Sequence, residues 1–178
     1  MLVKFLTRIA IASALFLPAL AGAEVRLQHA QGETVLAKTP AKLFVYDLAS
    51  LDILDALGVD VAGVPNTRMP PYLQKFGDAK HQKIGSLFEP DLEAVNAGKP
   101  DLIIVGGRSR AKFAQLAKMA PTVDLSIDSK DPIASVKTNV ERLGRLFGKE
   151  ERARALIGDL ERDIEALRGK AAHAGKGL

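Results

Sequence analysis

Apolar and polar positions alternate in two ways along this chain, and the alternation divides it into strand-like and helix-like segments. Residues 25–36 switch between apolar and polar side chains on both sides of Gln31-Gly32-Glu33, which predicts a small β-hairpin. Short apolar runs predict four further strands, and segments with a helical spacing of apolar residues separate them. The predicted strands are 42–46, 59–64, 102–105 and 121–125, and the predicted helices are 51–57, 71–76, 90–98, 109–119 and a pair within 132–172.

Residues that favour helix ends indicate where several of these helices start and stop. Ser50 precedes the first helical segment and is its predicted N-cap, and Gly58 ends that helix. Pro90 suits the first turn of the third helix. Gly144 and Gly148 predict a break between the last two helices, of which the second is long and highly charged.

The order of these segments predicts the fold class. Strands and helices that alternate at such spacings are typical of βαβ units. The run 102–105 is apolar throughout, as expected of a central parallel strand covered on both faces. The sequence therefore predicts an α/β fold, a Rossmann-like doubly wound parallel sheet followed by a long helix. We divide the chain into a signal peptide at 1–23, an α/β lobe at 24–148, and a connecting helix at 149–178 that leads to the start of a second lobe beyond this sequence.

The first 23 residues have the pattern of a signal peptide. Lys4 and Arg8 give a positive start, residues 9–20 form an apolar run, and Ala21-Gly22-Ala23 fits a signal peptidase site. A membrane anchor is the alternative, but this run is too short to span roughly 30 Å of hydrocarbon. The chain contains no cysteine, and therefore neither disulfides nor the acceptor for a lipid anchor. These features predict a free periplasmic protein that begins at Glu24.

Composition argues against a nucleic-acid-binding protein. The formal net charge of +4 includes two residues of the predicted signal peptide, and the other basic residues are interleaved with acidic ones. Aromatic residues make up 5% of the chain and tryptophan is absent, so platforms on which bases stack are scarce. We predict a monomer without a nucleic-acid partner.

Two loops are candidates for binding a ligand, because ligands of open α/β sheets bind at the carboxyl ends of strands, where the strand order switches. One loop runs from Asp47 to Ser50, and the other is Gly106-Gly107-Arg108-Ser109. Two glycines let the backbone approach a ligand closely, and backbone N–H groups at the start of a helix favour anions. Arg108 adds a planar, permanently charged fork of donors that suits an anionic chelate. The alternative is an ordinary surface arginine on a strand-to-helix turn.

Other chemistries lack their sequence signatures. The chain has no GxGxxG or GxxxxGKS/T phosphate-binding fingerprint, no GxSxG and no cysteine nucleophile. His29, His81 and His173 lack metal-ligand spacing and are predicted to be solvated surface residues, so no metal site is predicted. Carboxylates at 89–93 suit the first turn of a helix, and nothing beside them supports acid–base catalysis. We therefore predict that the protein is not an enzyme.

Four segments together resemble the siderophore-binding proteins of ABC importers, which are class III solute-binding proteins, and especially their catecholate and petrobactin type. The resemblance runs from Val25 to the last residue. The markers are residues 46–52 (YDLASLD), 84–91 (IGSLFEPD), 99–108 (KPDLIIVGGR) and 120–125 (APTVDL). The KPDL segment alone is shared by many class III binding proteins, whereas the four segments in this order are more specific.

The resemblance implies two α/β lobes joined by one long helix, with a ferric siderophore held between them and delivered to an ABC permease. The iron is then carried within the ligand, and the protein has no cofactor of its own. Arg108 is expected to face the anionic chelate, and Glu93 matches the glutamate with which relatives dock onto permease arginines. The implied ligand-binding residues are Asp47, Ser50, Ser86, Leu87, Phe88, Gly106, Gly107, Arg108 and Ser109.

Three alternatives stay open at this point. A cobalamin- or haem-binding protein of the same class shares the KPDL segment but gives less reason for Arg108 after two glycines. A Rossmann-type enzyme fits the fold class, although the missing fingerprints and the predicted signal peptide count against it. A lobe without tight ligand binding is the third alternative, because the family's second lobe, which supplies further ligand contacts, is not in this sequence.

Overall fold

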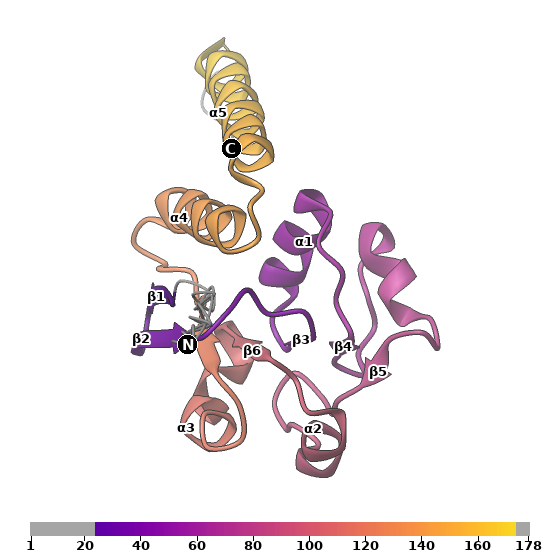
Figure 1. Cartoon of the computed structure of the whole chain (residues 1–178). Coiled ribbons are helices and arrows are strands. Elements are labelled where there is room, and N and C mark those ends of the chain that lie inside the picture. The colour runs from indigo at the N-terminus through magenta and orange to yellow at the C-terminus, as the bar shows by residue number, and fades with distance from the viewer. Residues whose placement is uncertain (1–23, 174–178) are drawn as a thin grey trace, which may run out of the picture.

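A five-stranded parallel sheet forms the centre of the computed structural model, which describes residues 24–173 (Figure 1). The predicted signal peptide lies outside the described residues. The strand order is β5-β4-β3-β6-β7. The strands are β3 (Leu43–Val45), β4 (Gly63–Val64), β5 (Gln82–Lys83), β6 (Leu102–Val105) and β7 (Thr122–Asp124). The predicted α/β class with a parallel sheet is confirmed.

The order of the strands reverses direction at β3. From β3 the chain adds β4 and then β5 on one side, and it then returns to pair β6 with the other side of β3 before β7 is added. The carboxyl ends of β3 and β6 therefore meet at the point where the strand order switches, the usual place for a ligand in such a sheet.

Helices cover both faces of the sheet, as predicted for a doubly wound fold. The α-helices are α1 (Leu48–Leu57), α2 (Leu92–Gly98), α3 (Phe113–Leu116), α4 (Pro132–Leu146) and α5 (Glu150–His173), and the 3-10 helices are η1 (Pro71–Gly77) and η2 (Gly107–Lys112). Leu102 and Ile104 of β6 join the larger core with α1 and α4, whereas Ile103 and Val105 join the smaller core with α2 and α3. All four side chains are fully buried because successive residues of a strand face opposite sides.

The predicted N-terminal hairpin is present and covers the β7 edge of the sheet. Strands β1 (Val25–His29) and β2 (Gly32–Leu36) pair antiparallel. The Ala30 N–H donates to the Asp124 carbonyl at 3.0 Å, and the Thr34 hydroxyl donates to the Thr122 carbonyl at 2.7 Å. These bonds occupy backbone acceptors of an edge strand that would otherwise face solvent.

The last two helices meet at the predicted break and pack closely there. A Cβ on Gly144 would lie 2.5 Å from the Cβ of Ala153, so α4 and α5 approach each other at a glycine. Figure 1 shows α5 extending from α4 away from the sheet, and Leu167 near its far end is 63% exposed. Within residues 24–173, no helix has the length and apolar character needed to cross a membrane.

Two helix starts differ from the prediction. Ser50 is not the N-cap of α1, because Asp47 accepts the Ser50 N–H at 2.8 Å and the helix begins at Leu48. Pro90 likewise lies before α2, whose N-cap is Asp91. In both helices an aspartate occupies the cap, since its carboxylate reaches the N–H three residues ahead.

The segment after β6 also differs from the prediction. A continuous helix over 109–119 was expected, but the chain forms the 3-10 helix η2 and then only four residues of α-helix in α3. Ser109, which was expected at the helix start, is instead fully buried inside η2. The tight turn brings its hydroxyl back onto Gly106, which the spacing of apolar residues does not encode.

Two histidines are buried, and the prediction of solvated side chains is wrong for both. His29 bonds through Nε2 to Thr34 at 2.9 Å, accepts the Gln31 N–H at 3.2 Å on Nδ1, and packs on Phe113. Burial lowers the pKa of His29, Asp124 opposes this shift, and Arg142 adds to it.

His81 is the second buried histidine. Its Nδ1 lies 2.8 Å from the Val61 carbonyl and its ring packs on Phe76, whereas its Nε2 has no hydrogen-bond partner among the described residues. The side chain of His173 lies outside the described residues. No group of three His, Cys, Asp or Glu side chains suited to a metal ion occurs in the described part of the chain.

Candidate functional site

A solvent-open pocket of about 480 Å³ lies at the carboxyl ends of β3 and β6. Its lining residues are Tyr46, Asp47, Leu48, Ala49, Leu87, Gly106, Gly107 and Arg108. Five of the nine predicted ligand-binding residues are therefore among the lining residues, although their binding role stays a prediction. The two loops named from sequence meet here because β6 pairs directly with β3.

The β3 side of the pocket is organised by Asp47. Its Oδ2 accepts both the N–H and the hydroxyl of Ser50 at 2.8 Å, which caps α1. Ser50 is 1% exposed, so this predicted ligand residue is buried beneath the pocket lining, where it bonds to Asp47. A Cβ on Gly106 would lie only 2.9 Å from the Asp47 Cγ, so this close approach of the two loops requires glycine.

The β6 side of the pocket is a turn fixed by Ser109. The Ser109 hydroxyl accepts the Gly106 N–H at 3.0 Å, and the Gly106 carbonyl lies at the same distance. Gly107 follows with φ +49°, in the left-handed region that glycine adopts without strain. This turn ends on Arg108 at the pocket wall.

Arg108 is exposed, and its guanidinium makes no hydrogen bond or ion pair with any residue in 24–173. A guanidinium without a protein partner keeps its planar set of donors available. Such a group on a pocket wall can bind a carboxylate, a catecholate or another oxygen anion of a ligand.

The third wall of the site is a turn at residues 86–89 that carries Leu87 into the pocket lining. The Ser86 hydroxyl accepts the N–H groups of Phe88 at 3.2 Å and of Glu89 at 3.0 Å. Lys112 of η2 donates to the Glu89 carboxylate at 2.8 Å, which ties this turn to the segment after β6. Phe88 is 58% exposed at the tip of the turn and does not line the pocket itself.

Tyr46 links the β3 side of the pocket to the segment that leads into the 86–89 turn. Its hydroxyl donates to the Ile84 carbonyl at 2.7 Å, and its side chain is fully buried. Burial, together with the negative charge of Asp91, raises the pKa of Tyr46 far above its ordinary value, so the hydroxyl stays a donor.

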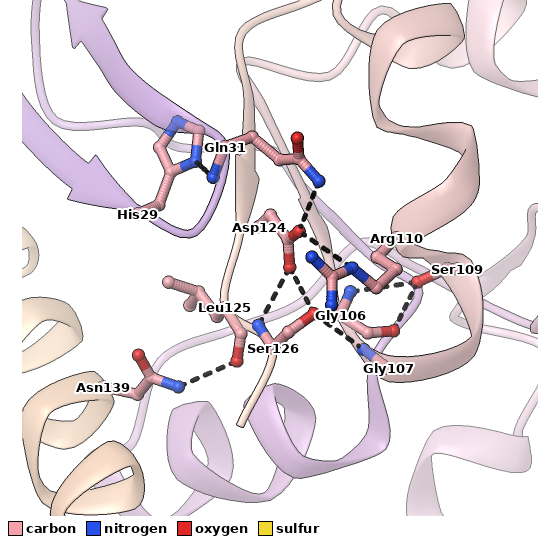
Figure 2. A network of polar contacts seen from close by, with 10 residues as sticks. All are labelled: His29, Gln31, Gly106, Gly107, Ser109, Arg110, Asp124, Leu125, Ser126 and Asn139. Carbon is pink, nitrogen blue, oxygen red and sulfur yellow. Dashed lines mark hydrogen bonds and ion pairs between the residues drawn. The ribbon is translucent and has the colours of Figure 1, made fainter. Parts of the chain in front are cut away.

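Two polar residues near the site were missed by the sequence argument. Asp124 is the last residue of β7 and Ser126 lies two residues further on, and the Ser126 oxygen accepts the Gly107 N–H at 3.1 Å (Figure 2). The available signal was that Asp124 ends a strand at the same edge of the sheet. Only the pairing of β6 with β7 brings it behind the Gly106–Arg108 turn.

Glu93 lies apart from the pocket, in the first turn of α2, and is exposed as expected. The predicted helix-stabilising role of Asp91 takes the form of an N-cap, since its Oδ1 accepts the Ala94 N–H at 2.9 Å. Glu89 belongs to the preceding turn and not to this helix.

A doubly wound lobe with an open pocket at the switch of strand order, continued by a long helix, defines a class of solute-binding proteins. The chain belongs to this class: the family model described as "Periplasmic binding protein" matches residues 43–177. The fold and the family predicted from the sequence are thereby confirmed.

Individual relatives support the same placement. The petrobactin-binding protein YclQ of Bacillus subtilis is 37% identical over 149 residues, which is 83% of this chain and 47% of the relative. The ferric-anguibactin-binding protein FatB of Vibrio anguillarum is 26% identical over 82% of this chain and 47% of its own length. The chain thus spans about half the length of the curated relatives it matches.

Solved structures show the same fold. The crystal structure of YclQ superposes with a TM-score of 0.84 at 34% identity, covering 87% of this chain and 56% of that protein. The catecholate-siderophore-binding protein VctP of Vibrio cholerae superposes with a TM-score of 0.79 at 29% identity, covering 85% and 55%. The family is therefore one of substrate-binding proteins with a fold that this lobe shares.

Proposed function

We propose that this chain is one lobe of an exported binding protein that captures a ferric siderophore and delivers it to an ABC permease. The single observation that carries the proposal is the open pocket at the β3–β6 switch, with the unpaired guanidinium of Arg108 in its wall. The printed names of relatives that bind petrobactin and ferric anguibactin support the ligand class.

The chemistry of the pocket fits an anionic, aromatic chelate better than the alternatives in the same class. Arg108 offers charged donors to the oxygens of the chelate, and Phe88 presents an exposed ring on the neighbouring turn. A catechol ring can stack on such a side chain. A cobalamin- or haem-binding protein of the same class has less need of a guanidinium without a protein partner at this turn.

No bond is made or broken in this function. The iron arrives within the ligand, the protein contributes shape and charge, and no cofactor is required. We propose a monomer that acts in the periplasm after cleavage before Glu24 and whose second pocket wall comes from a second lobe.

The proposal is tested by ligand binding to the whole protein as its gene encodes it. Equilibrium dialysis with ferric petrobactin measures the Kd for the wild type and for Arg108→Ala. One charge-assisted hydrogen bond is worth about 1.5–3 kcal/mol, so the variant should bind roughly 10- to 150-fold more weakly. Arg108→Lys should recover only part of this loss, because an ammonium does not reproduce the planar fork.

A matched control separates the contact from general charge. Arg154 is also an exposed arginine, but it lies on α5 beside α4 and away from the pocket. Arg154→Ala should leave the Kd within about twofold of wild type, since it alters only screened long-range charge. Absence of binding to ferric petrobactin and to ferric enterobactin by the wild type would refute the proposed function.

The permease partner is tested through Glu93. In the whole protein, Glu93→Ala should lower siderophore-dependent iron uptake and leave the Kd for the ligand unchanged, because Glu93 lies away from the pocket. Glu151→Ala is the control, since Glu151 is an exposed carboxylate in the first turn of α5. A large loss of ligand affinity in Glu93→Ala would contradict the docking role.

A further inference from the structure

A buried carboxylate lies behind the Arg108 turn, and the side-chain and backbone groups that bond to its two oxygens are all donors (Figure 2). The Asp124 side chain is 0% exposed. Its Oδ1 accepts the N–H of Ser126 at 2.9 Å and also the Ser126 hydroxyl. Its Oδ2 accepts from Gln31 Nε2 at 3.1 Å and lies 3.7 Å from Arg110 Nε. Because a carboxylate can only accept, it fixes the direction in which each of these donors points.

Ser126 transmits this orientation to the ligand-binding turn. Its only hydroxyl hydrogen is directed at Asp124, so the lone pairs of the oxygen are left to accept from another group. That group is the Gly107 N–H, at 3.1 Å. Since Ser109 holds the adjacent Gly106 from the other side, the turn is anchored at two successive residues immediately before Arg108.

These bonds restrict a segment that would otherwise be free to move. Gly107 is exposed and has the wide conformational range of glycine. Without the bond to Ser126, its N–H would exchange this fixed acceptor for water, and the peptide between Gly106 and Gly107, to which this N–H belongs, would be held only through the Gly106 carbonyl, which accepts from Ser109. The bond therefore reduces the number of directions in which the Arg108 side chain leaves the turn.

The same carboxylate connects the turn to the N-terminal hairpin. Gln31 lies between β1 and β2, and the neighbouring Ala30 N–H donates to the Asp124 carbonyl. The hairpin and the Arg108 turn are thus held by one residue at the end of β7. Asp124 therefore connects two segments that are distant in the sequence, in addition to bonding within its own loop.

We propose that Asp124 and Ser126 are positioning residues for the binding site, which preorganise the Gly106–Arg108 turn so that the guanidinium meets the anionic chelate. This inference rests on the proposed function and goes beyond it, because neither residue lines the Arg108 pocket. Their contribution is to reduce the ordering cost of binding, which amounts to a few-fold in affinity for one constrained segment.

The test is a double-substitution cycle in the whole protein, with ferric petrobactin as the probe and equilibrium dialysis as the measurement. Ser126→Ala removes the acceptor of the Gly107 N–H, and we expect it to weaken binding about three- to tenfold. Ser126→Thr keeps the hydroxyl and should bind within about twofold of wild type. In an Arg108→Ala background, Ser126→Ala should change the Kd by less than about 1.5-fold, because no guanidinium remains to be positioned.

Controls separate positioning from damage to the fold. Ser129→Ala removes an exposed hydroxyl from the same loop that makes no hydrogen bond among the described residues, and it should leave the Kd unchanged. Thermal unfolding of Ser126→Ala should remain a single cooperative transition at a lower temperature than that of wild type: the freed N–H of Gly107 can bond to water, but the buried Asp124 carboxylate loses one of its donors. Asp124→Asn supplies a second variant. An amide has one accepting oxygen where the carboxylate has two, so it cannot accept from Ser126, Gln31 and Arg110 together.

The possible outcomes test the positioning role and the proposed function separately. Equal losses from Ser126→Ala with and without Arg108, or no loss in either background, would overturn the positioning role. An Arg108→Ala variant with wild-type affinity would also overturn it while leaving siderophore binding in place. A wild-type protein that binds no ferric siderophore would instead overturn the proposed function.

Discussion

Replacement of Gly106 by alanine tests whether the two walls of the pocket are packed as closely as the structure indicates. The φ of Gly106 is 179°, an extended value that any residue adopts, so alanine introduces no backbone strain there. The added Cβ would instead lie 2.9 Å from the Cγ and 3.2 Å from the Cβ of Asp47. Overpacking of this kind typically costs about 1–3 kcal/mol, and part of it should appear as a weakened N-cap of α1.

The steric origin of this cost is measurable in a second background. Asp47→Ala alone should lower the free energy of unfolding by about 0.5–2 kcal/mol through loss of the cap. It also removes the carboxyl group that the new Cβ would meet, so the double variant should be more stable than the sum of the two losses predicts, by about 1 kcal/mol. Urea unfolding followed by circular dichroism measures all four proteins.

Gly107→Ala is the matched control for the Gly106 substitution. A Cβ on Gly107 would have only one neighbour within 4 Å, an oxygen of Asp47 at 3.8 Å, but its φ of +49° is unfavourable for alanine. Its cost should therefore be the same with and without the Asp47 carboxylate. Strict additivity of Gly106→Ala and Asp47→Ala would refute the close contact between the two loops.

Three further predictions concern pH, a buried hydroxyl and export. The folded pKa of His29 is lowered below the ordinary value of 6.5, so the contribution of neutral His29 to the free energy of unfolding is complete above that pH and is lost as the pH falls through the lowered pKa. Urea unfolding should therefore give a smaller free energy of unfolding at pH 5 than at pH 7. His29→Gln should reduce this difference between the two pH values. Tyr46→Phe removes one of two donors to the Ile84 carbonyl, which keeps the Asp91 N–H at 2.9 Å, and should cost about 0.5–1.5 kcal/mol of unfolding free energy in the same assay; an unchanged value would contradict a contribution of the hydroxyl to stability. Intact-mass measurement of the exported protein should show a chain that begins at Glu24, and a retained 1–23 segment would contradict the predicted cleavage.

Local signals in the sequence identified most elements of the fold. The apolar run 102–105 became the buried strand β6, and residues 25–36 became the β1–β2 hairpin, because strand and turn formation depend on neighbouring residues. The same signals did not locate the ends of α1 and α2, where Asp47 and Asp91 provide the caps. Several residues near each start can cap a helix, and the surrounding packing selects one of them.

Burial of the histidines depended on contacts that are distant in the sequence. His81 lies in a polar segment, and a surface position was the reasonable expectation. It is buried because its ring packs on Phe76 while its Nδ1 reaches the carbonyl of Val61, twenty residues earlier. No pattern along the chain encodes such a pairing.

The sequence by itself determined the α/β class, the family, and the two loops of the candidate site, because these follow from the order of elements and from local motifs such as KPDLIIVGGR. Only the tertiary structure decided that β6 lies between β3 and β7. That order places the Arg108 turn against Asp47 on one side and against Ser126 and Asp124 on the other. Strand order arises from the burial of both sheet faces over the whole lobe, so the neighbours of the Arg108 turn are set only when all of the strands are in place.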